Sequence, residues 1–282
     1  PESRMLAFDL NLPLRKGGGK YDVKTVKPML QKLGYSGGAI NTIVEAKELL
    51  ERKKGLPEPV VAVPPEKDDE DNKARPLSLP ETPGEPSPKK IVLLQRLTIS
   101  VDSAQEVAAV GALVSKNRKC FDIVAMRPTT EEAIDKCCTL DCIEIISLEL
   151  WQRMTFRLRL PMIQAADKKG IVFELAYAAA IRDQSLRRNL FSNASELIRL
   201  KRKGRRILIT SEATHSMELR GVHDVVNLGV LFGLREADAI AALTIVPKRV
   251  ISMGKERLHA KAKNVSCIVT TIVNDEAAER KN

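Results

Sequence analysis

Positively charged side chains dominate residues 181–206, and their chemistry is the easiest in this sequence to predict. Nine residues of this segment are Lys or Arg, against only Asp183 and Glu196. Ammonium and guanidinium groups bind phosphate oxygens, and the planar donors of arginine match two oxygens at once. A merely solvated helix face usually alternates both signs of charge at i and i+4, which this segment does not do. The segment is therefore predicted to bind a polyanion.

The same segment has the hydrophobic spacing of an amphipathic α-helix. Apolar residues recur at i, i+4, i+8, i+11 and i+12, namely Leu186, Leu190, Ala194, Leu197 and Ile198. At about 100° per residue, four cations fall on the opposite side, namely Arg188, Arg199, Arg202 and Lys203. We expect a helix that packs by its apolar side and presents a cationic face outward.

The distribution of charge narrows the class of ligand. Residues 151–210 contain fourteen Lys or Arg against four acidic residues, an excess that equals the formal net charge of +10 for the whole chain. A localised basic field favours nucleic acid or an anionic membrane surface. The membrane is disfavoured because no run of about 18 apolar residues occurs. Aromatic residues make up only 4% of the chain, which favours recognition of the backbone and shape of structured RNA over base stacking.

Candidates for acid, base or metal chemistry are few. Asp9, Asn11, Asn41 and Glu212 lie at the ends of predicted strands, where α/β enzymes place active sites. The three histidines, at positions 215, 223 and 259, form no ligand pair of the H-x-H or H-E-x-x-H type. Divalent-metal hydrolases need several converging His and Asp ligands, so a catalytic metal site is disfavoured. Asp9 and Asn11 are expected to hold neighbouring backbone groups or basic side chains.

Nucleophile and cysteine patterns are equally weak. Ser211 and Ser216 lie near His215, but without a G-x-S-x-G turn they are interpreted as turn or capping serines. The five cysteines, at 120, 137, 138, 142 and 267, lack the paired spacing of a zinc site. They are expected to pack as small hydrophobic residues in a protein of a reducing compartment.

Apolar, β-rich runs alternate with helical patterns along the chain. Strands are predicted over residues 5–10, 38–42, 91–101, 121–127, 142–147, 171–177 and 206–210. Helices are predicted over residues 23–33, 43–53, 103–115, 129–137 and 161–169, in the cationic segment up to Gly204, and over 224–232 and 236–245 before Pro247. Continuously apolar strands are typical of parallel sheets buried on both faces. The fold class is therefore α/β, but periodicity does not separate a closed barrel from an open doubly wound sheet.

Two regions interrupt this alternation. Residues 57–88 hold nine prolines and an acidic run at 68–71, and they are expected to form a disordered surface insertion. The chain becomes polar beyond residue 257, apart from the short apolar run at 267–273, which is a candidate for an added strand. We predict one α/β domain over residues 5–250 and a partly flexible extension over 251–282.

Arginines near strand ends add to the candidate binding surface, because they can act as forks for phosphate. Arg96 lies within a strand and is interpreted either as such a fork or as a buried ion-pair partner. The predicted RNA-binding residues are Arg182, Arg187, Arg188, Arg202, Lys203, Arg205 and Arg206, with Arg127, Lys168, Lys169 and Arg220 behind them.

Eight motifs occur together in one order. They are FDLNLP (8–13), LGYSGGAIN (33–41), RLTISVD (96–102), FDIVAMRP (121–128), RLRLPMIQAADKKGIVFELAYAAAIRD (157–183), RRNLFSNASELI (187–198), GRRILITSEA (204–213) and MELRGVHDVVNLGVLFGL (217–234). In these motifs the chain resembles the barrel-type protein subunit of archaeal and eukaryotic nuclear ribonuclease P, which eukaryotes share with ribonuclease MRP. The resemblance covers residues 5–250 and no part of the insertion or the tail.

The resemblance implies a barrel of the polymerase-and-histidinol-phosphatase type, TIM-barrel-like, with seven or so parallel strands. Catalytic relatives of that fold carry an H-x-H metal motif at the first strand, and Asp9-Leu10-Asn11 stands in its place here. The family further implies that the catalytic metals, Mg²⁺, belong to the RNA subunit, and that this chain binds no cofactor. It also implies nuclear and nucleolar residence, precursor tRNA as the particle's substrate, and partners that include a small α/β-sandwich protein subunit and other particle proteins.

These observations lead to the hypothesis of a non-catalytic, RNA-binding scaffold subunit that supports removal of the tRNA 5′ leader, and rRNA processing in ribonuclease MRP. The main rival is a stand-alone metal-dependent phosphoesterase on the same barrel. A third hypothesis is that the cationic face binds an acidic protein segment, including the chain's own residues 66–71.

Overall fold

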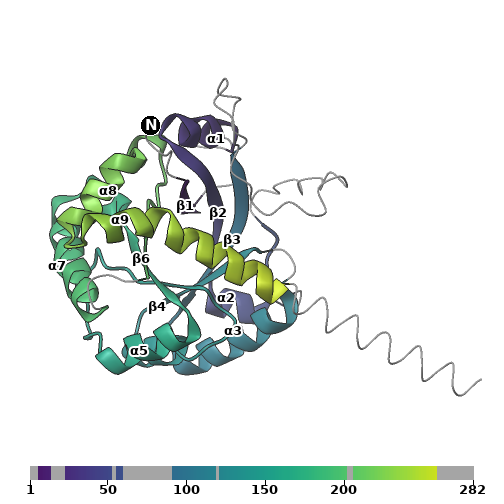
Figure 1. Ribbon diagram of the computed structural model, residues 1–282. Coiled ribbons are helices and arrows are strands. Elements are labelled where there is room, and N and C mark those ends of the chain that lie inside the picture. Colours follow the sequence, from purple (N-terminus) through teal and green to yellow (C-terminus); the bar gives the residue numbers. More distant parts are fainter. Residues whose placement is uncertain are drawn as a thin grey trace, which may run out of the picture.

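The computed structural model describes residues 6–13, 23–52, 55–59, 91–118, 121–201 and 206–258. Seven parallel strands form one sheet in the order of the sequence (Figure 1). They are β1 (Ala7–Leu12), β2 (Tyr35–Glu45), β3 (Val92–Val101), β4 (Ile123–Pro128), β5 (Ile145–Ser147), β6 (Val172–Ala176) and β7 (Ile207–Thr210). All seven predicted strands are confirmed.

The sheet curls into a nearly closed, TIM-barrel-like ring. A doubly wound sheet reverses its strand order part-way across, whereas this order runs without reversal from β1 to β7. The backbone N–H of Glu212, just beyond β7, donates to the carbonyl oxygen of Asn11 at 3.1 Å. The N–H of Ser211 donates to Asp9 Oδ1 at 3.1 Å, so the seam between the first and last strands is bridged at one end.

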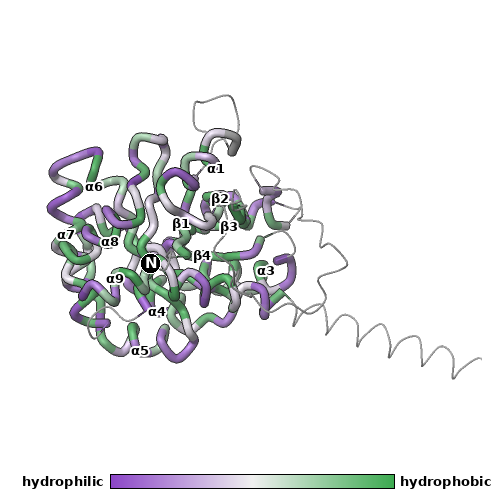
Figure 2. The backbone as a smooth tube through the Cα atoms, turned by 45° about the horizontal axis from the view of Figure 1, so that its top comes forward, coloured by the Kyte–Doolittle hydropathy of each residue, from purple (hydrophilic) through white to green (hydrophobic). Residues whose placement is uncertain are grey.

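Helices follow the strands and cover the outside of the ring (Figure 1). They are α1 (Val23–Lys32), α2 (Ala46–Glu51), α3 (Ala104–Asn117), α4 (Glu131–Cys137), α5 (Leu160–Lys169), α6 (Ala178–Arg182), α7 (Gln184–Leu200), α8 (Val222–Leu231) and α9 (Glu236–Leu243), with a 3-10 turn η3 at Ser216–Glu218. Figure 2 shows mostly hydrophobic strands and hydrophilic stretches along the surrounding helices and loops.

The start predicted for the second helix, residue 43, is wrong. Residues 43–45 continue β2, with Val44 beside Ile99 and Glu45 beside Ser100 of β3, and α2 begins only at Ala46. Ile43 and Val44 are β-branched, and pairing with β3 outweighs the helical spacing of the residues that follow.

A further helix spans residues 245–258, which sequence analysis missed. The sequence indicates that Pro247 ends the helix predicted over residues 236–245, but this expectation is wrong. Pro247 lies in the first turn of the helix 245–258, where the missing N–H has no intrahelical acceptor to lose. Val246 and Val250 pack against apolar residues inside the lower half of the barrel, including Leu10 and Leu208. The helix thereby plugs the end of the barrel where the strands begin, and it continues across position 250, the predicted domain boundary.

Several predicted features lie outside the described residues: the bulk of the insertion with its acidic run, the tail after residue 258, Cys120, Cys267, His259, Arg202, Lys203 and Arg205. Cys137 and Cys138 are buried and unpaired, in agreement with their expected packing role. Within the described ranges, no helix is both long and apolar enough to cross a bilayer. The same ranges hold no cluster of three or more His, Cys, Asp or Glu that could bind a metal ion.

Candidate nucleic-acid interface

Helix α7 forms as its apolar spacing predicts. The Asp183 carboxylate caps its first turn by accepting hydrogen bonds from the N–H groups of Ser185 (2.6 Å) and Leu186 (3.0 Å). Leu190, Ala194, Leu197 and Ile198 are buried and Leu186 is half-buried, so the predicted packing face is confirmed. The helix runs from the top of the barrel, where the strands end, to the bottom, where they begin.

The outward cations of α7 lack acidic partners. Arg187, Arg188 and Arg199 are exposed, and no described carboxylate lies within ion-pair distance of any of them. Arg187 Nε donates to the carbonyl oxygen of Ala180 at 2.7 Å, which orients the side chain without neutralising it. The acidic N-cap residue of α7, Asp183, accepts hydrogen bonds from backbone N–H groups and pairs with none of these arginines. Intramolecular contacts therefore do not offset the charge of this face.

Three other predicted cations are already paired. Arg182 donates to both carboxylate oxygens of Glu218, at 2.6 and 3.0 Å. Lys169 donates to both oxygens of Asp141, at 2.7 and 2.8 Å. Arg127 is almost fully buried, and it lies 2.5 Å from Glu212 and 3.6 Å from Glu149.

Arg127 also lies over the Trp151 ring, 5.6 Å from its centroid. Its guanidinium is thus held inside the barrel mouth by carboxylates and an aromatic face. Its charge is already compensated within the chain, unlike the charge of the exposed arginines of α7, and a role of Arg127 as a phosphate fork stays a prediction.

The remaining described candidates have only carbonyl partners or none. Arg206 donates to the carbonyl oxygen of Asp167 at 2.7 Å, and Arg220 donates to those of Met217 (2.7 Å) and Leu219 (2.9 Å). Lys168 is exposed at the end of α5. Carbonyl oxygens fix a guanidinium in place and leave its charge available to a ligand.

Sequence reasoning overlooked two exposed arginines, Arg153 and Arg157, in the loop between β5 and α5. This loop lies against α7, because Asn193 donates to the carbonyl oxygens of Leu150 (2.7 Å) and Gln152 (2.9 Å), and Asn189 donates to that of Trp151 (3.2 Å). Both arginines belong to the basic segment 151–210, but no periodicity connects their loop to the helix. We call Arg153, Arg157, Arg187, Arg188 and Arg199 the α7 face.

The inside of the barrel mouth holds a second cationic group. Arg96 is fully buried and donates to Glu174 Oε1 (2.5 Å) and Oε2 (2.7 Å), so the buried ion-pair interpretation is confirmed. Burial raises the pKa of a carboxyl group, but Arg96 outweighs this effect and lowers the pKa of Glu174 to about 2. Thr210 Oγ1 donates to the same carboxylate at 2.8 Å, and Asn11 Nδ2 donates to it at 3.2 Å.

Strand-end residues considered for catalysis are engaged in holding the barrel together. Asp9 Oδ1 accepts from the N–H groups of Asn11 (3.2 Å) and Ser211 (3.1 Å), as expected of a residue that holds backbone. Burial raises the pKa of Asp9 to about 6. Asn41 Nδ2 donates to Asn11 Oδ1 at 2.7 Å, and Ser211 Oγ accepts from the N–H of Ala213 at 3.2 Å. The interpretation of Ser211 as a turn serine is therefore confirmed.

Comparisons with known proteins agree with this geometry. The family model for RNase P subunit p30 matches residues 6–259. The chain belongs to this family.

Relatives extend over most of the chain. The mouse ribonuclease P protein subunit p30 is 33% identical over 98% of this chain and 94% of its own length. A probable ribonuclease P protein subunit 3 of Schizosaccharomyces pombe is 30% identical over 77% of this chain and 79% of its own. A chain in a cryo-EM structure of archaeal ribonuclease P with mature tRNA shares the fold, with a TM-score of 0.56 at 12% identity over 88% of this chain and 91% of that one.

Proposed function

We propose that this chain is a non-catalytic subunit that binds and scaffolds RNA in a ribonuclease P and MRP particle, where it supports removal of the tRNA 5′ leader and processing of rRNA. The observation that carries the proposal is the α7 face, with five exposed arginines and no acidic partner among the described residues. RNA phosphates would supply the missing negative charge.

Catalysis in this proposal belongs to the RNA subunit with its Mg²⁺ ions. The barrel mouth supports this assignment, because the Glu174 carboxylate is already held by both terminal nitrogens of Arg96. A buried guanidinium beside that carboxylate repels a divalent cation. The rival phosphoesterase is not favoured, since the family to which the chain belongs consists of RNase P subunits.

The particle's remaining components follow from the family. We propose as partners the RNase P or MRP RNA, precursor tRNA, a small α/β-sandwich protein subunit and the other particle proteins, with the nucleus and nucleolus as the location. The Mus musculus relative is named a subunit of ribonuclease P and the Saccharomyces cerevisiae relative a subunit of ribonuclease P/MRP, which supports membership of such a particle.

The salt dependence of RNA affinity tests the proposal. Replacing Arg188 and Arg199 with glutamine removes two phosphate contacts, so the slope of log K against log salt becomes less steep by roughly 0.7–0.9 for each contact. The probe is the RNA subunit of the particle, measured with the isolated chain by fluorescence anisotropy.

A matched control removes the same charge elsewhere. Lys47 and Arg52 of the α2 region are exposed and paired with Asp102 and Glu48. Their double replacement with glutamine is expected to leave the slope unchanged. Equal slopes for the α7 double variant and the parent chain would refute RNA binding by the α7 face.

A further inference from the structure

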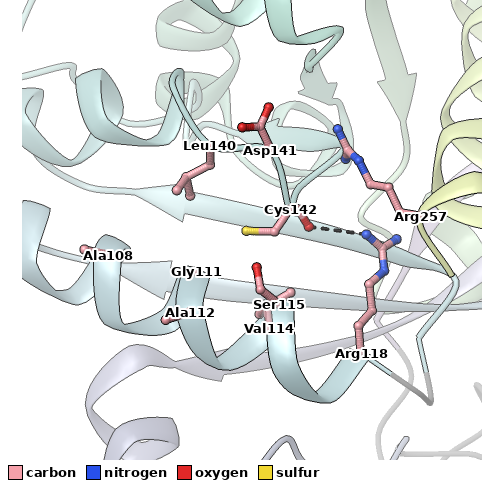
Figure 3. Close-up of a pocket in the computed structure, with 10 residues that line it drawn as sticks. All are labelled: Ala108, Gly111, Ala112, Val114, Ser115, Arg118, Leu140, Asp141, Cys142 and Arg257. Carbon is pink, nitrogen blue, oxygen red and sulfur yellow. Dashed lines mark hydrogen bonds between the residues drawn. The ribbon is translucent and has the colours of Figure 1, made fainter. Parts of the chain in front are cut away.

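A pocket of about 470 Å³ opens beside α3, away from α7, and Figure 3 shows the residues that line it. Its floor is α3, which follows the third strand, whereas α7 follows the sixth strand of the ring of seven. Figure 1 accordingly shows α3 and α7 on different sides of the barrel. The loop that leads into β5 and the end of the helix 245–258 form the remaining walls.

The floor of the pocket is a strip of small side chains at helical spacing. Ala108, Gly111, Ala112 and Ser115 occupy positions i, i+3, i+4 and i+7 of α3. Gly111 allows Leu140 of the neighbouring loop to pack closely against α3, because a Cβ at this position would lie only 3.3 Å from Leu140 Cδ2. Small residues at this spacing allow another helix to approach closely, with its side chains packed into the grooves.

The rim of the pocket carries two arginines that share one carboxylate. Arg118 donates to both oxygens of Glu144, at 2.7 and 2.8 Å, and Arg257 donates to Glu144 Oε1 at 2.6 Å. Asp141 also lines the pocket, but Lys169 already holds both of its oxygens. One guanidinium charge at the rim therefore has no counterpart among the lining residues.

A second observation at the rim is a buried hydrogen-bond donor of Arg118 that lacks an acceptor in the described part of the chain. Arg118 is only 4% exposed, yet no atom of the described residues accepts a hydrogen bond from its Nε. Buried donors are nearly always satisfied by protein groups or ordered water, so an acceptor is expected here that the described residues do not supply. Arg257 is 23% exposed, so its guanidinium remains accessible beside Arg118 (Figure 3).

We propose that this pocket docks an α-helix of another protein subunit, one that carries a small apolar side chain for the α3 floor and a carboxylate for Arg118 and Arg257. The lining contains no aromatic residue on which an RNA base could stack, and its small apolar floor offers nothing to phosphate. The docking surface rests on the proposed function only in that the chain works inside a particle with several proteins.

Photo-crosslinking in the assembled particle identifies the occupant. A diazirine amino acid at position 112 is expected to crosslink to a helical peptide of another protein subunit, with an acidic residue within one turn of the linked position. The matched control is the same amino acid at Ala109, which is exposed on α3 but outside the pocket, and which is expected to crosslink at least tenfold less. Crosslinks from position 112 to RNA, to a second copy or to residues 259–282, or a yield no higher than at 109, would each overturn the proposal.

Charge substitutions on the exposed face of α3 test the predicted carboxylate. Ala112→Glu is expected to lower incorporation into the particle at least tenfold in a competition with the parent chain, because it repels an acidic partner. Ala112→Lys fills the same space with the opposite charge and is expected to lower incorporation much less, while Ala109→Glu has no effect. Equal losses for the two substitutions at position 112 would refute an acidic occupant.

This outcome is separable from the fate of the proposed function. The Ala112 variants leave the α7 face untouched, so the salt dependence of RNA binding by the isolated chain is expected to match that of the parent. A chain that loses its place in the particle but keeps its RNA slope supports the docking surface alone.

Discussion

The arginines inside the barrel and those on the α7 face differ in whether a carboxylate of the same chain compensates their charge. Arg96 is fully buried and bound to both oxygens of Glu174. Arg188 and Arg199 are exposed, and the described part of the chain offers them no carboxylate. Removing the charge of Arg96 is therefore expected to destabilise the fold. Removing the charges on α7 is expected to change the stability little.

This contrast separates structural from functional arginines. An arginine that serves the fold has its donors satisfied within the chain, because an unpaired charge in the interior is expensive. An arginine that serves a ligand leaves its charge unsatisfied until the ligand arrives. Arg182 lies between these cases, since it is partly exposed but bound to Glu218.

The largest expected effect follows from breaking the interior pair. Arg96→Met strands the Glu174 carboxylate in the barrel and is expected to lower the free energy of unfolding by about 3–5 kcal/mol. Urea denaturation at neutral pH measures this loss.

The double variant Arg96→Met/Glu174→Leu provides the control, since it removes both charges together. It is expected to recover much of the lost stability. A cost below about 1 kcal/mol for the single variant would show that the pair does not hold the barrel mouth.

The pH dependence of stability gives the next largest effect. Burial raises the pKa of Asp9 to about 6 from an ordinary value of 3.8, so the folded protein binds this proton more tightly than the unfolded chain does. The proton's contribution to stability is therefore present at low pH and is lost as the pH rises from about 4 to about 6. At 1.36 kcal/mol per pKa unit, the loss is about 2–3 kcal/mol.

Asp9→Asn isolates this contribution. Its side-chain oxygen still accepts from the N–H groups of Asn11 and Ser211, but the group no longer titrates. The stability difference between parent and variant is expected to change across pH 4–6 and to level off above it. Glu174, whose pKa is lowered to about 2, acts in the opposite direction at lower pH and cancels in the comparison. A constant difference across pH 4–6 would contradict the buried, proton-binding Asp9.

The fold was largely predictable because strands buried on both faces have a strong signal. All seven strands and the packing face of α7 follow from local apolar spacing. The errors arose where local signals are ambiguous. Propensity alone does not distinguish a proline that ends one helix from a proline in the first turn of the next, as Pro247 shows.

The candidate site was less predictable, because pairing depends on contacts distant in sequence. Arg127 is 85 residues from its partner Glu212, and Arg96 is 78 residues from Glu174. No spacing rule connects such positions before the barrel closes. Arg153 and Arg157 were missed for the same reason, since tertiary contacts, among them the hydrogen bonds of two asparagines on α7, bring their loop to the helix.

The smallest expected effect is also the sharpest test of the contrast between the two groups. Arg188 lies near the positive N-terminal end of the α7 dipole and Arg199 lies in its last turn, near the negative end. Arg188→Glu is therefore expected to raise the free energy of unfolding by a few tenths of a kcal/mol, at most about 0.5, and Arg199→Glu is expected to lower it by a similar amount. Both changes are expected to weaken RNA binding, because both remove a cation from the same face.

Paired urea titrations at low salt, repeated near 1 M salt where the dipole effect is screened, measure the stability changes. The expected result is that the two substitutions change stability in opposite directions but both weaken RNA binding. It would mean that Arg188 serves RNA binding although its positive charge disfavours the helix. If Arg188→Glu instead destabilised the chain and left RNA affinity intact, the arginine would serve the fold, and the distinction between the α7 face and the barrel interior would fail at that residue.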